Sequence, residues 1–314
     1  RQPFGQEFGN YINGVSIDRY ANDRITWEKA RMMNLGIEIG LFNKIDIQAD
    51  YFTEYRSNIL MDRAQIPATM GLQSPLRANV GEASSNGYEI TIDYNDQLNK
   101  DLYVGFRANF SYADSKYEVY EELDYLNAGL PWRSRIGLNL SQPYGYIAER
   151  LFIDEADVAN SPLQTFGDYM AGDIKYKDIN NDGIIDINDE VPIGYPTTPK
   201  IIYGFGLSSK YKSFDFSFFF QGSAKSSFFV DAYNSSPFID TYGGKIGNNA
   251  LLNAWANDHW SENDRNLYAA WPRLSSQLID NNNRNSTWWL RDGTFLRLKS
   301  VEFGYSIENK AASK

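Results

Sequence analysis

The stretch LGIEIGLFNKIDIQADYF, residues 35–52, alternates apolar and polar side chains on both sides of a short turn. Residues 35–41 and 45–51 carry an apolar or aromatic side chain at every second position, and residues 42–44 lie between them. Successive side chains of a β-strand point to opposite faces of its sheet, so a period of two predicts strands with one apolar face. We interpret the stretch as an antiparallel hairpin.

The same pattern recurs further along the chain. Two more hairpins are predicted, one over residues 88–112 with its turn at 95–100, and one over residues 203–220 with its turn at 212–213. A seventh strand is predicted at 301–307, with no partner strand after it. Helical periodicity is almost absent, so the predicted fold class is all-β, and we do not expect the sheet to close within this sequence.

The connections between these strands fall into two length classes. The turns are short, whereas the other connections are long and cover about residues 57–86, 114–200 and 222–294. Transmembrane β-barrels combine short periplasmic turns with long extracellular loops, and loops of this length are rare in compact soluble domains. We therefore predict a transmembrane antiparallel β-barrel with long extracellular loops. A hidden hairpin, residues 136–140 followed by 144–152, would keep every long connection on one side.

Composition excludes several classes of function. Thirty Lys and Arg against 40 Asp and Glu give a formal net charge of −10, which disfavours binding to nucleic acid. The chain has no cysteine and one histidine, His259, so we expect no disulfide, no thiol nucleophile and no cysteine or histidine metal cluster. No run approaches the roughly 18 apolar residues of a membrane-spanning helix. The start lacks a signal peptide, so we interpret the chain as processed or partial.

An acidic segment, DINNDGIIDIND at residues 178–189, has the spacing of a twelve-residue calcium loop. The expected oxygen ligands are Asp178, Asn180, Asp182, the Ile184 carbonyl, Asp186 and Asp189. The last position is normally Glu, and the flanking helices of such loops are not predicted here. Two hypotheses stay open: a Ca²⁺ site that stiffens an extracellular loop, and an Asx-rich turn whose side chains bond their own backbone.

The last long connection is rich in aromatic residues. Aromatic rings beside Asn and Asp are one way to bind sugars, by stacking and hydrogen bonding, and loop packing is the commoner role. The residues concerned are Trp255, Trp260, Trp271, Trp288, Trp289, Tyr233, Tyr242 and Tyr268. Nucleophile motifs and phosphate-binding loops are absent, and His259 has no recognisable catalytic partner, so we expect no enzymatic activity and no organic cofactor.

Several segments, in order along residues 25–307, resemble the SusC-like (RagA-like) TonB-dependent transporters of the outer membrane. These segments are ITWEKA (25–30), NLGIE (34–38), NVGE (79–82), NGYE (86–89), GDIKYKD (172–178) with the acidic segment after it, HWSEND (259–264), WPRL (271–274) and WLRDGTFLRLKSV (289–301). The resemblance implies that residues 1–314 are one domain, a later part of a barrel of about 22 strands. The family's amino-terminal extension, its plug and its last strands are missing from this sequence.

The resemblance also implies a function, the import of glycan or peptide nutrients. A SusD-like lipoprotein would close over the extracellular loops, the TonB complex would act through the missing amino-terminal part, and the transporter–lipoprotein pair would form a dimer. The long connections should face the lipoprotein and the substrate, and apolar strand residues should face outer-membrane lipid. Lumen-facing residues should be the polar set Asp46, Gln48, Asp50, Glu89, Thr91, Asp93, Arg107 and Asn109.

Two other classes of protein compete with this interpretation. One is a soluble carbohydrate-binding β-domain with a calcium-stabilised loop, which would carry polar residues on its outer face. The apolar alternation of residues 102–112 argues against it. The other is a surface β-barrel enzyme or adhesin, for which the sequence offers no catalytic constellation.

Overall fold

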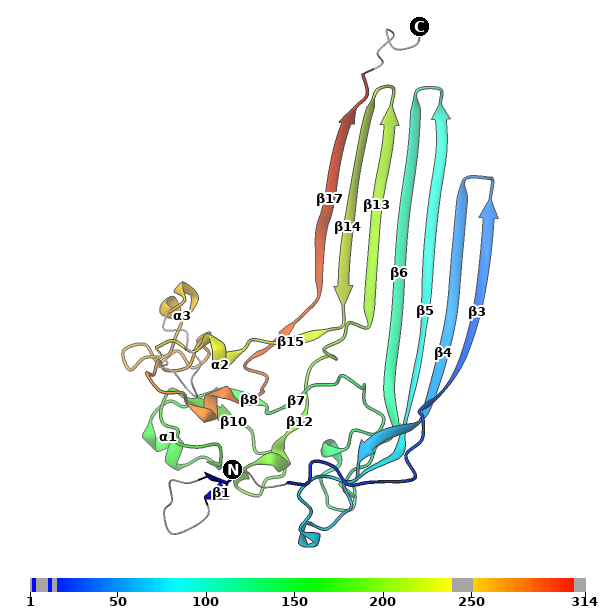
Figure 1. The fold of residues 1–314 in the computed structure, drawn as a ribbon. Helices are drawn as coiled ribbons and strands as arrows, with labels where there is room; N and C mark the ends of the chain where they lie inside the picture. Colours follow the sequence, from blue (N-terminus) through cyan, green and yellow to red (C-terminus); the bar gives the residue numbers. More distant parts are fainter. Residues whose placement is uncertain (1, 4–10, 13–15, 239–250, 308–314) are drawn as a thin grey trace.

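The computed structural model describes residues 2–3, 11–12, 16–238 and 251–307, and it consists of one large sheet and a body of folded connecting segments (Figure 1). Seven long strands form the sheet, in the order β17-β14-β13-β6-β5-β4-β3. Their bounds are β3 Lys29–Leu41, β4 Ile45–Asp62, β5 Arg77–Asn99, β6 Leu102–Val119, β13 Ile201–Tyr211, β14 Phe214–Ala224 and β17 Phe295–Tyr305. Within the described residues, no helix is long and apolar enough to cross a membrane.

Each long strand pairs antiparallel with the next long strand along the chain. The three predicted hairpins and the seventh strand are thereby confirmed. Short turns join the hairpins at one end of the sheet, and the long connections gather at the other end (Figure 1). The sheet is open, with β3 and β17 at its edges.

The register places apolar residues on one face across the whole sheet. Directly opposed residues in antiparallel strands lie on the same face, so one row can be followed from edge to edge. One such row consists of Ile39, Ile47, Ile92, Ala108, Phe205, Phe220 and Leu298. The adjacent row, on the other face, consists of Glu38, Gln48, Thr91, Asn109, Gly204, Gln221 and Arg297. The sheet therefore has one apolar face and one polar face, as predicted.

Aromatic residues bound the apolar face at both ends. On the side of the long connections, Tyr88 stacks on Tyr112 with ring centroids 5.3 Å apart. On the side of the short turns, Phe214 lies 4.8 Å from Tyr305, and Tyr211 is opposite Phe214. From the level of Tyr211 to that of Tyr112, the strands rise by about 25 Å if they are tilted by about 40° at roughly 3.3 Å per residue. This height matches the apolar band of an outer-membrane barrel.

The apolar face is open to its surroundings. On the two edge strands, Leu35 and Phe303 keep 72% and 70% of their surface exposed, and each of the other long strands also carries large exposed apolar side chains, with smaller exposed fractions. A soluble monomer rarely exposes a contiguous apolar surface of this extent. Beyond Tyr112 the same face turns polar, with Asp114 opposite Asn86. The exposed apolar face therefore fits a lipid environment of limited thickness.

The predicted ends of the long connections are partly wrong. The first one covers residues 63–76 and not 57–86, because β4 continues to Asp62 and β5 begins at Arg77. The strands keep pairing beyond the apolar band, where Arg56, Ala83 and Tyr117 are aligned in neighbouring strands. Backbone pairing does not require apolar side chains, so hydropathy did not reveal these extensions. The other two long connections cover residues 120–200 and 225–294.

The hidden hairpin is also wrong. Residues 136–140 form no strand, and residues 144–152 form the short strands β7 (Tyr144–Gly145) and β8 (Ala148–Leu151). These pair with β12 (Val191–Pro192) and β10 (Ile174–Tyr176), away from the large sheet. Leu151 and Phe152 are fully buried, so their apolar character belongs to a loop core and not to a membrane strand.

The remaining elements are short. They are the strands β1 (Gln2–Pro3), β2 (Tyr11–Ile12), β9 (Leu163–Gln164), β11 (Ile184–Ile185), β15 (Ser227–Phe229) and β16 (Leu290–Asp292), the α-helices α1 (Glu155–Ala159), α2 (Ala232–Ser235) and α3 (Asn253–Asn257), and 3₁₀ turns at 68–70, 131–133, 187–189 and 280–283.

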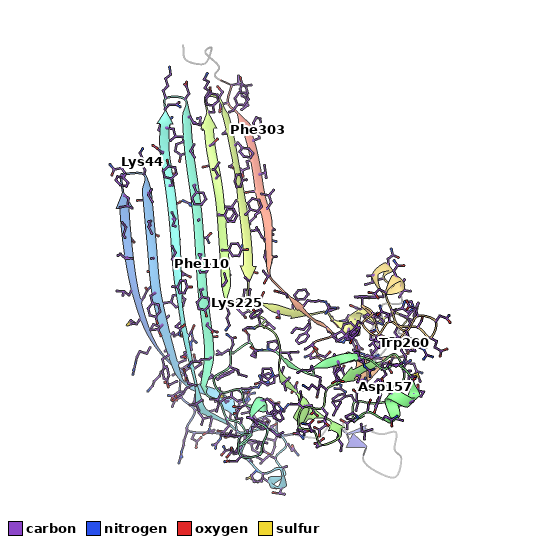
Figure 2. All side chains as sticks on the ribbon, turned by 180° about the vertical axis from the view of Figure 1, so that it is seen from behind. Lys44, Phe110, Asp157, Lys225, Trp260 and Phe303 are labelled. Carbon is purple, nitrogen blue, oxygen red and sulfur yellow. The ribbon has the colours of Figure 1, made fainter. Side chains whose placement is uncertain are left out.

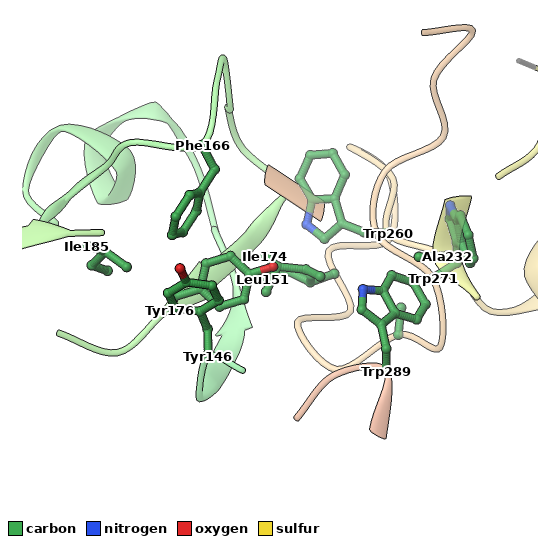
Figure 3. Close-up of a cluster of buried hydrophobic side chains, with 11 residues drawn as sticks. Tyr146, Leu151, Phe166, Ile174, Tyr176, Ile185, Ala232, Trp260, Trp271 and Trp289 are labelled. Carbon is green, nitrogen blue, oxygen red and sulfur yellow. The ribbon is translucent and has the colours of Figure 1, made fainter. Parts of the chain in front are cut away.

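The second and third long connections fold together into one unit, which we call the loop body (residues 120–200, 225–238 and 251–294). It extends sideways from the loop end of the sheet, as Trp260 and Asp157 show in Figure 2. Its core takes side chains from both connections (Figure 3). The buried members are Tyr146, Leu151, Phe166, Ile174, Tyr176 and Ile185 from the second connection, and Ala232, Trp260, Ala269, Trp271 and Trp289 from the third.

Buried amides join the two connections at this core. The Asn282 amide accepts a hydrogen bond from the Ile174 backbone N–H at 2.9 Å and donates one to Asp173 Oδ1 at 2.9 Å. The Asn281 amide donates to the Ile174 carbonyl at 2.9 Å, and the Tyr176 hydroxyl donates to the Asn281 carbonyl at 2.7 Å. Buried polar groups are costly unless they are paired, so this network favours a single arrangement of the two connections.

Candidate functional site

The predicted lumen residues all lie on the polar face of the sheet. Register aligns Asp46 with Asp93 and Arg107, and it aligns Gln48 with Thr91 and Asn109. Asp50 lies opposite Glu89. The sequence therefore predicted correctly which strand residues share this face.

Charge on the polar face is concentrated in the first strands of the sheet. Arg107 forms an ion pair with Asp93. Asp46 faces Asp93, and Asp50 faces Glu89, so carboxylates stand directly opposite each other across neighbouring strands. Directly opposed like charges destabilise a sheet in isolation, which indicates that this face is adapted to solvent or to a polar occupant.

Phe219 is a large apolar side chain on this polar face. Its ring covers Gly204 and Gly206, where an added Cβ would lie 2.7 Å from ring atoms. The two glycines thus make room for the ring in the neighbouring strand. This position explains an aromatic residue that breaks the alternation.

Two cavities adjoin the polar face where the strands meet the loop body. The larger, of about 610 Å³, is lined by Arg56, Ala83 and Tyr117, which continue the polar face beyond the apolar band. The smaller, of about 310 Å³, is lined by loop-body residues and by Ala64 of the first connection. Tyr120 and Glu121 line both cavities, so the two are neighbours.

Stacked arginines and tyrosines form the wall of the smaller cavity. The guanidinium carbon of Arg135 lies 4.6 Å from the centre of the Tyr144 ring and 5.9 Å from that of Tyr120. Arg133 lies 5.6 Å from the centre of the Tyr125 ring. Burial raises the pKa of Tyr144 to about 12, and its hydroxyl donates a hydrogen bond to the Ser134 carbonyl at 2.7 Å. The hydroxyl therefore stays protonated at neutral pH.

The acidic segment 178–189 folds into a tight loop held by its own backbone. The Asp178 carboxylate accepts hydrogen bonds from the Asn181 and Gly183 N–H groups at 2.6 and 2.8 Å. The buried Asp189 carboxylate accepts bonds from the Ile179 and Asp186 N–H groups at 2.8 and 2.9 Å. Among the described residues, no three His, Cys, Asp or Glu side chains gather closely enough to hold a metal ion. This geometry matches the Asx-rich turn, and the Ca²⁺ site stays a prediction.

The acidic loop is hydrogen-bonded to Arg133, which lines the smaller cavity, and to the adjacent Trp132. The Trp132 indole N–H donates to the Asn188 carbonyl at 2.7 Å. Arg133 donates to the Ile187 carbonyl at 2.6 Å and forms an ion pair of 2.7 Å with Glu190. Sequence reasoning missed this connection, because more than 50 positions separate the partners and no spacing rule relates them.

Most of the loop tryptophans serve packing. Trp260, Trp271 and Trp289 are 7%, 5% and 2% exposed and belong to the loop-body core, so the sugar-stacking hypothesis is wrong for these three residues (Figure 3). Trp255 packs against Trp271 with ring centroids 4.9 Å apart, and Trp288 is partly buried against the same core. The Trp255–Trp271 and Trp271–Trp289 pairs pack at tilted angles, as side chains of a loop core do.

The other aromatic candidates and the histidine lie elsewhere. Tyr233 and Tyr268 are 39% and 71% exposed, and Tyr242 lies outside the described residues. The His259 ring nitrogen Nδ1 is 2.9 Å from the Trp255 carbonyl oxygen, a local backbone contact. Tyr233, Tyr268 and His259 line neither of the two cavities that lie where the strands meet the loop body.

Arg150, Asp157 and Lys175 form an ion-pair cluster in the loop body. Asp157 accepts hydrogen bonds from Arg150, from Lys175 at 3.2 Å and from the Ile153 N–H at 3.0 Å. The Arg150 guanidinium, the backbone bond and Lys175 hold the pKa of Asp157 well below its usual range. Burial raises the pKa of Asp173, against the opposing effect of Arg273. The listed partners of Asp157 and Asp173 all lie in the loop body, so both groups contribute to its stability.

An open antiparallel sheet with an exposed apolar band, aromatic borders, a polar opposite face and long connections at one end defines a segment of a transmembrane β-barrel. The sequence agrees with this class. A family model described as TonB dependent receptor-like, beta-barrel, matches residues 1–234, and the chain belongs to this family. Membership places the chain in the outer membrane.

Sequence similarity to curated TonB-dependent receptors supports this family membership. The chain is 26% identical to TonB-dependent receptor P3 of Formosa agariphila over 96% of its length, and 24% identical to TonB-dependent receptor SusC of Bacteroides thetaiotaomicron, also over 96%. It covers 29% and 28% of these two proteins. The chain therefore spans less than a third of the length of the curated relatives it matches.

Solved structures show the same fold. The RagAB peptide importer in its closed-closed state superimposes with a TM-score of 0.62 at 23% identity, over 94% of this chain and 31% of that one. A further structure of the RagAB peptide transporter gives a TM-score of 0.64 at 21% identity, over 98% and 32%. At this identity the similarity establishes the fold of the barrel segment and of its long connections.

Proposed function

We propose that the protein to which this chain belongs imports glycan or peptide nutrients across the outer membrane in a TonB-dependent manner, together with a SusD-like surface lipoprotein. The observation that carries the proposal is the unbroken apolar row from Ile39 to Leu298, backed by an equally unbroken polar row. Such a sheet separates lipid from a polar interior, as a transport barrel must. Family membership and the names of the relatives, which include a receptor called SusC and a peptide importer, support the same function.

The polar face and the loop body would have different roles in transport. The polar face would line the passage, and its charged groups would interact with polar cargo and with the plug. The loop body would form part of the outer mouth, where its joined connections would present one firm surface to a lipoprotein and its cargo. TonB would act through a part of the protein that lies outside this chain.

The acidic loop is proposed to bind Ca²⁺ as a structural ion. Asp178, Asn180, Asp182, the Ile184 carbonyl, Asp186 and Asp189 would hold it, as the spacing of the segment predicts. The ion would require the carboxylates to turn toward a common centre and exchange some of their backbone bonds. Its effect would be to stiffen the loop that fastens Trp132 and Arg133.

Uptake by cells tests the import function. A strain that lacks the full-length gene, and the same strain complemented with it, are grown on defined glycans or on defined peptides as the limiting nutrient. We expect a growth defect on one nutrient class, restoration by the gene, loss of uptake when a protonophore is added, and a lipoprotein that copurifies with the tagged transporter. Recovery of the full-length protein in the soluble fraction without detergent would instead favour the soluble carbohydrate-binding domain.

A further inference from the structure

Basic residues lie on the outward face of the sheet, which is the apolar face and its continuation, just beyond the apolar band. These residues, which we call the border cations, are Lys29, Arg31, Lys116, Lys200 and Lys225. We propose that they bind the phosphate groups of a phosphorylated glycolipid, the lipid class of the outer leaflet of the outer membrane. This inference goes beyond import, because it concerns the lipid around the barrel and not its cargo.

Strand register places three of the border cations on the outward face. Arg31 and Lys116 lie in one row, which crosses β3, β4, β5 and β6. Along β6, Lys116 follows Tyr112 by four positions, an even number, so the two side chains lie on the same face. Lys29 precedes Arg31 by two positions in β3 and shares its face. All three therefore continue the face that carries the apolar band.

The other two border cations reach this face from the ends of β13 and β14. Lys225, directly after β14, lies at the loop end of the sheet, with its amine 5.8 Å from the centre of the Tyr112 ring (Figure 2). Lys200, directly before β13, pairs with Asp114 at 2.8 Å. Asp114 comes two positions after Tyr112 on the same face. Both amines therefore lie close to the aromatic border of the band.

Positive charge is in excess on this surface, although the whole chain has a formal net charge of −10. Three carboxylates accompany the five border cations, those of Glu82, Asp114 and Glu118. Each carboxylate already has a partner, a tyrosine hydroxyl for Glu82 and a lysine for the other two. Within the described part of the chain, Lys29, Arg31 and Lys225 form no ion pair. Such a surface attracts anionic headgroups.

The height of the border cations matches the headgroup layer of one leaflet. The long connections mark the extracellular end of a barrel, so this leaflet is the outer one. Lys225 lies at the level of Tyr112, and Lys116 lies roughly 10 Å further out if the strands rise roughly 3.3 Å per residue at a tilt of about 40°. Below them, exposed apolar side chains such as Leu35 and Ile90 would contact acyl chains. One lipid could thus place phosphates on the cations and chains on the band.

Neutral hydrogen-bonding groups lie among the border cations. In the row between Tyr112 and Lys116, Thr53 is aligned with Asn86, which is exposed. Hydroxyl and amide groups of this kind pair with sugar hydroxyls, whereas phosphates form their strongest hydrogen bonds with cations. A surface with both kinds of group suits a headgroup that carries both sugars and phosphates. This composition favours a phosphorylated glycolipid over an ordinary phospholipid.

Lipid binding to the purified protein tests the inference. The intact transporter, with any copurifying partner, is delipidated in a neutral detergent and titrated with lipid A, an acylated and phosphorylated glucosamine disaccharide. Parallel titrations use the same lipid A after removal of its phosphates, and phosphatidylglycerol. Native mass spectrometry counts the bound lipids and gives their affinity.

The variant combines Arg31→Gln with Lys225→Gln, two border cations without an ion pair among the described residues. The matched control is Lys212→Gln, because Lys212 lies 5.3 Å from the centre of the Tyr211 ring at the opposite border of the band. Both variants remove a lysine that lies over a border tyrosine. Heat-modified gel mobility confirms that each variant is a folded barrel.

We expect phosphorylated lipid A to bind, and removal of its phosphates to weaken binding about tenfold or more. The double variant should weaken binding about tenfold, and Lys212→Gln should leave it within about twofold. Four results would overturn the inference: lipid A does not bind, its dephosphorylated form binds equally well, phosphatidylglycerol binds as tightly, or the control loses as much affinity as the double variant. Nutrient uptake plays no part in this experiment, so its failure and that of the import function are distinguishable.

Discussion

Asn282 donates a hydrogen bond to the buried carboxylate of Asp173 across 109 positions of sequence, with donor and acceptor 2.9 Å apart. The same Asn282 side chain accepts a bond from the Ile174 N–H. Two segments that leave the sheet at different strands are therefore joined at one buried amide. This contact accounts for the loop body as a unit and leads to the first prediction.

Asn282→Ala should loosen the loop body. It leaves the Ile174 N–H and one side of Asp173 without partners in a buried site, at a cost of about 1–3 kcal/mol. Hydrogen exchange should then rise in residues 163–176 and 267–289 of the intact protein, with no change in the strands. Asn283→Ala is the matched control, because the Asn283 amide donates only to the nearby Ile279 carbonyl. Equal exchange in both variants would show that the buried network does not join the connections.

Arginine on the apolar face should block insertion. Phe205 lies in the central apolar row, and Phe205→Arg places a charge at the middle of the bilayer, at a cost of about 2–4 kcal/mol. Asn109→Arg, in the adjacent polar row, should insert normally. The measurement is the fraction of heat-modifiable, protease-protected protein in outer-membrane extracts. Similar yields for the two variants would contradict the assignment of the faces.

Asp157→Asn should destabilise the loop body at neutral pH. The pKa of Asp157 is lower in the folded protein than in the unfolded chain, so its ionised form stabilises the fold. This stability is fully present above about pH 4, the pKa of the unfolded chain, and it is lost as the pH falls through the folded pKa. The variant should therefore show faster proteolysis of the loop body at pH 7, and the difference from the parent should shrink under strong acid. A difference that grew on acidification would rule out this charge linkage. Asp168→Asn, at an exposed aspartate outside the cluster, is the control.

Calcium binding by the acidic loop can be detected with terbium. Trp132 lies beside the loop, with its indole bonded to the Asn188 carbonyl, so it should sensitise luminescence from a Tb³⁺ ion held by residues 178–189. We expect a luminescence signal that Ca²⁺ displaces and that Asp178→Asn and Asp182→Asn abolish, with Asp168→Asn unchanged. Absence of the signal in the intact protein would leave the Asx-rich turn as the full account of the segment.

Some of the candidate site was predictable and some was not. The lumen set, such as Thr91 and Asn109, follows from alternation, because parity along a strand determines the face. Trp260 and Trp289 carry no such signal: an aromatic residue in a long loop looks the same whether it packs in a core or faces a ligand. The wall of the smaller cavity has no sequence signature at all, since Arg135 and Tyr144 come together through the path of an irregular segment.

The sequence by itself determined the strands, their two faces, the positions of the short turns and the family, because these depend on the spacing of residues close together in the chain. Only the tertiary structure decided how far β4 and β5 extend beyond the apolar band, that two long connections fold as one body, and that tyrosines and arginines converge at its mouth. These features depend on contacts such as that between Ile174 and Asn282, which are 108 positions apart. Contacts of this kind form between the surfaces of folded segments, and no local pattern of residues encodes them.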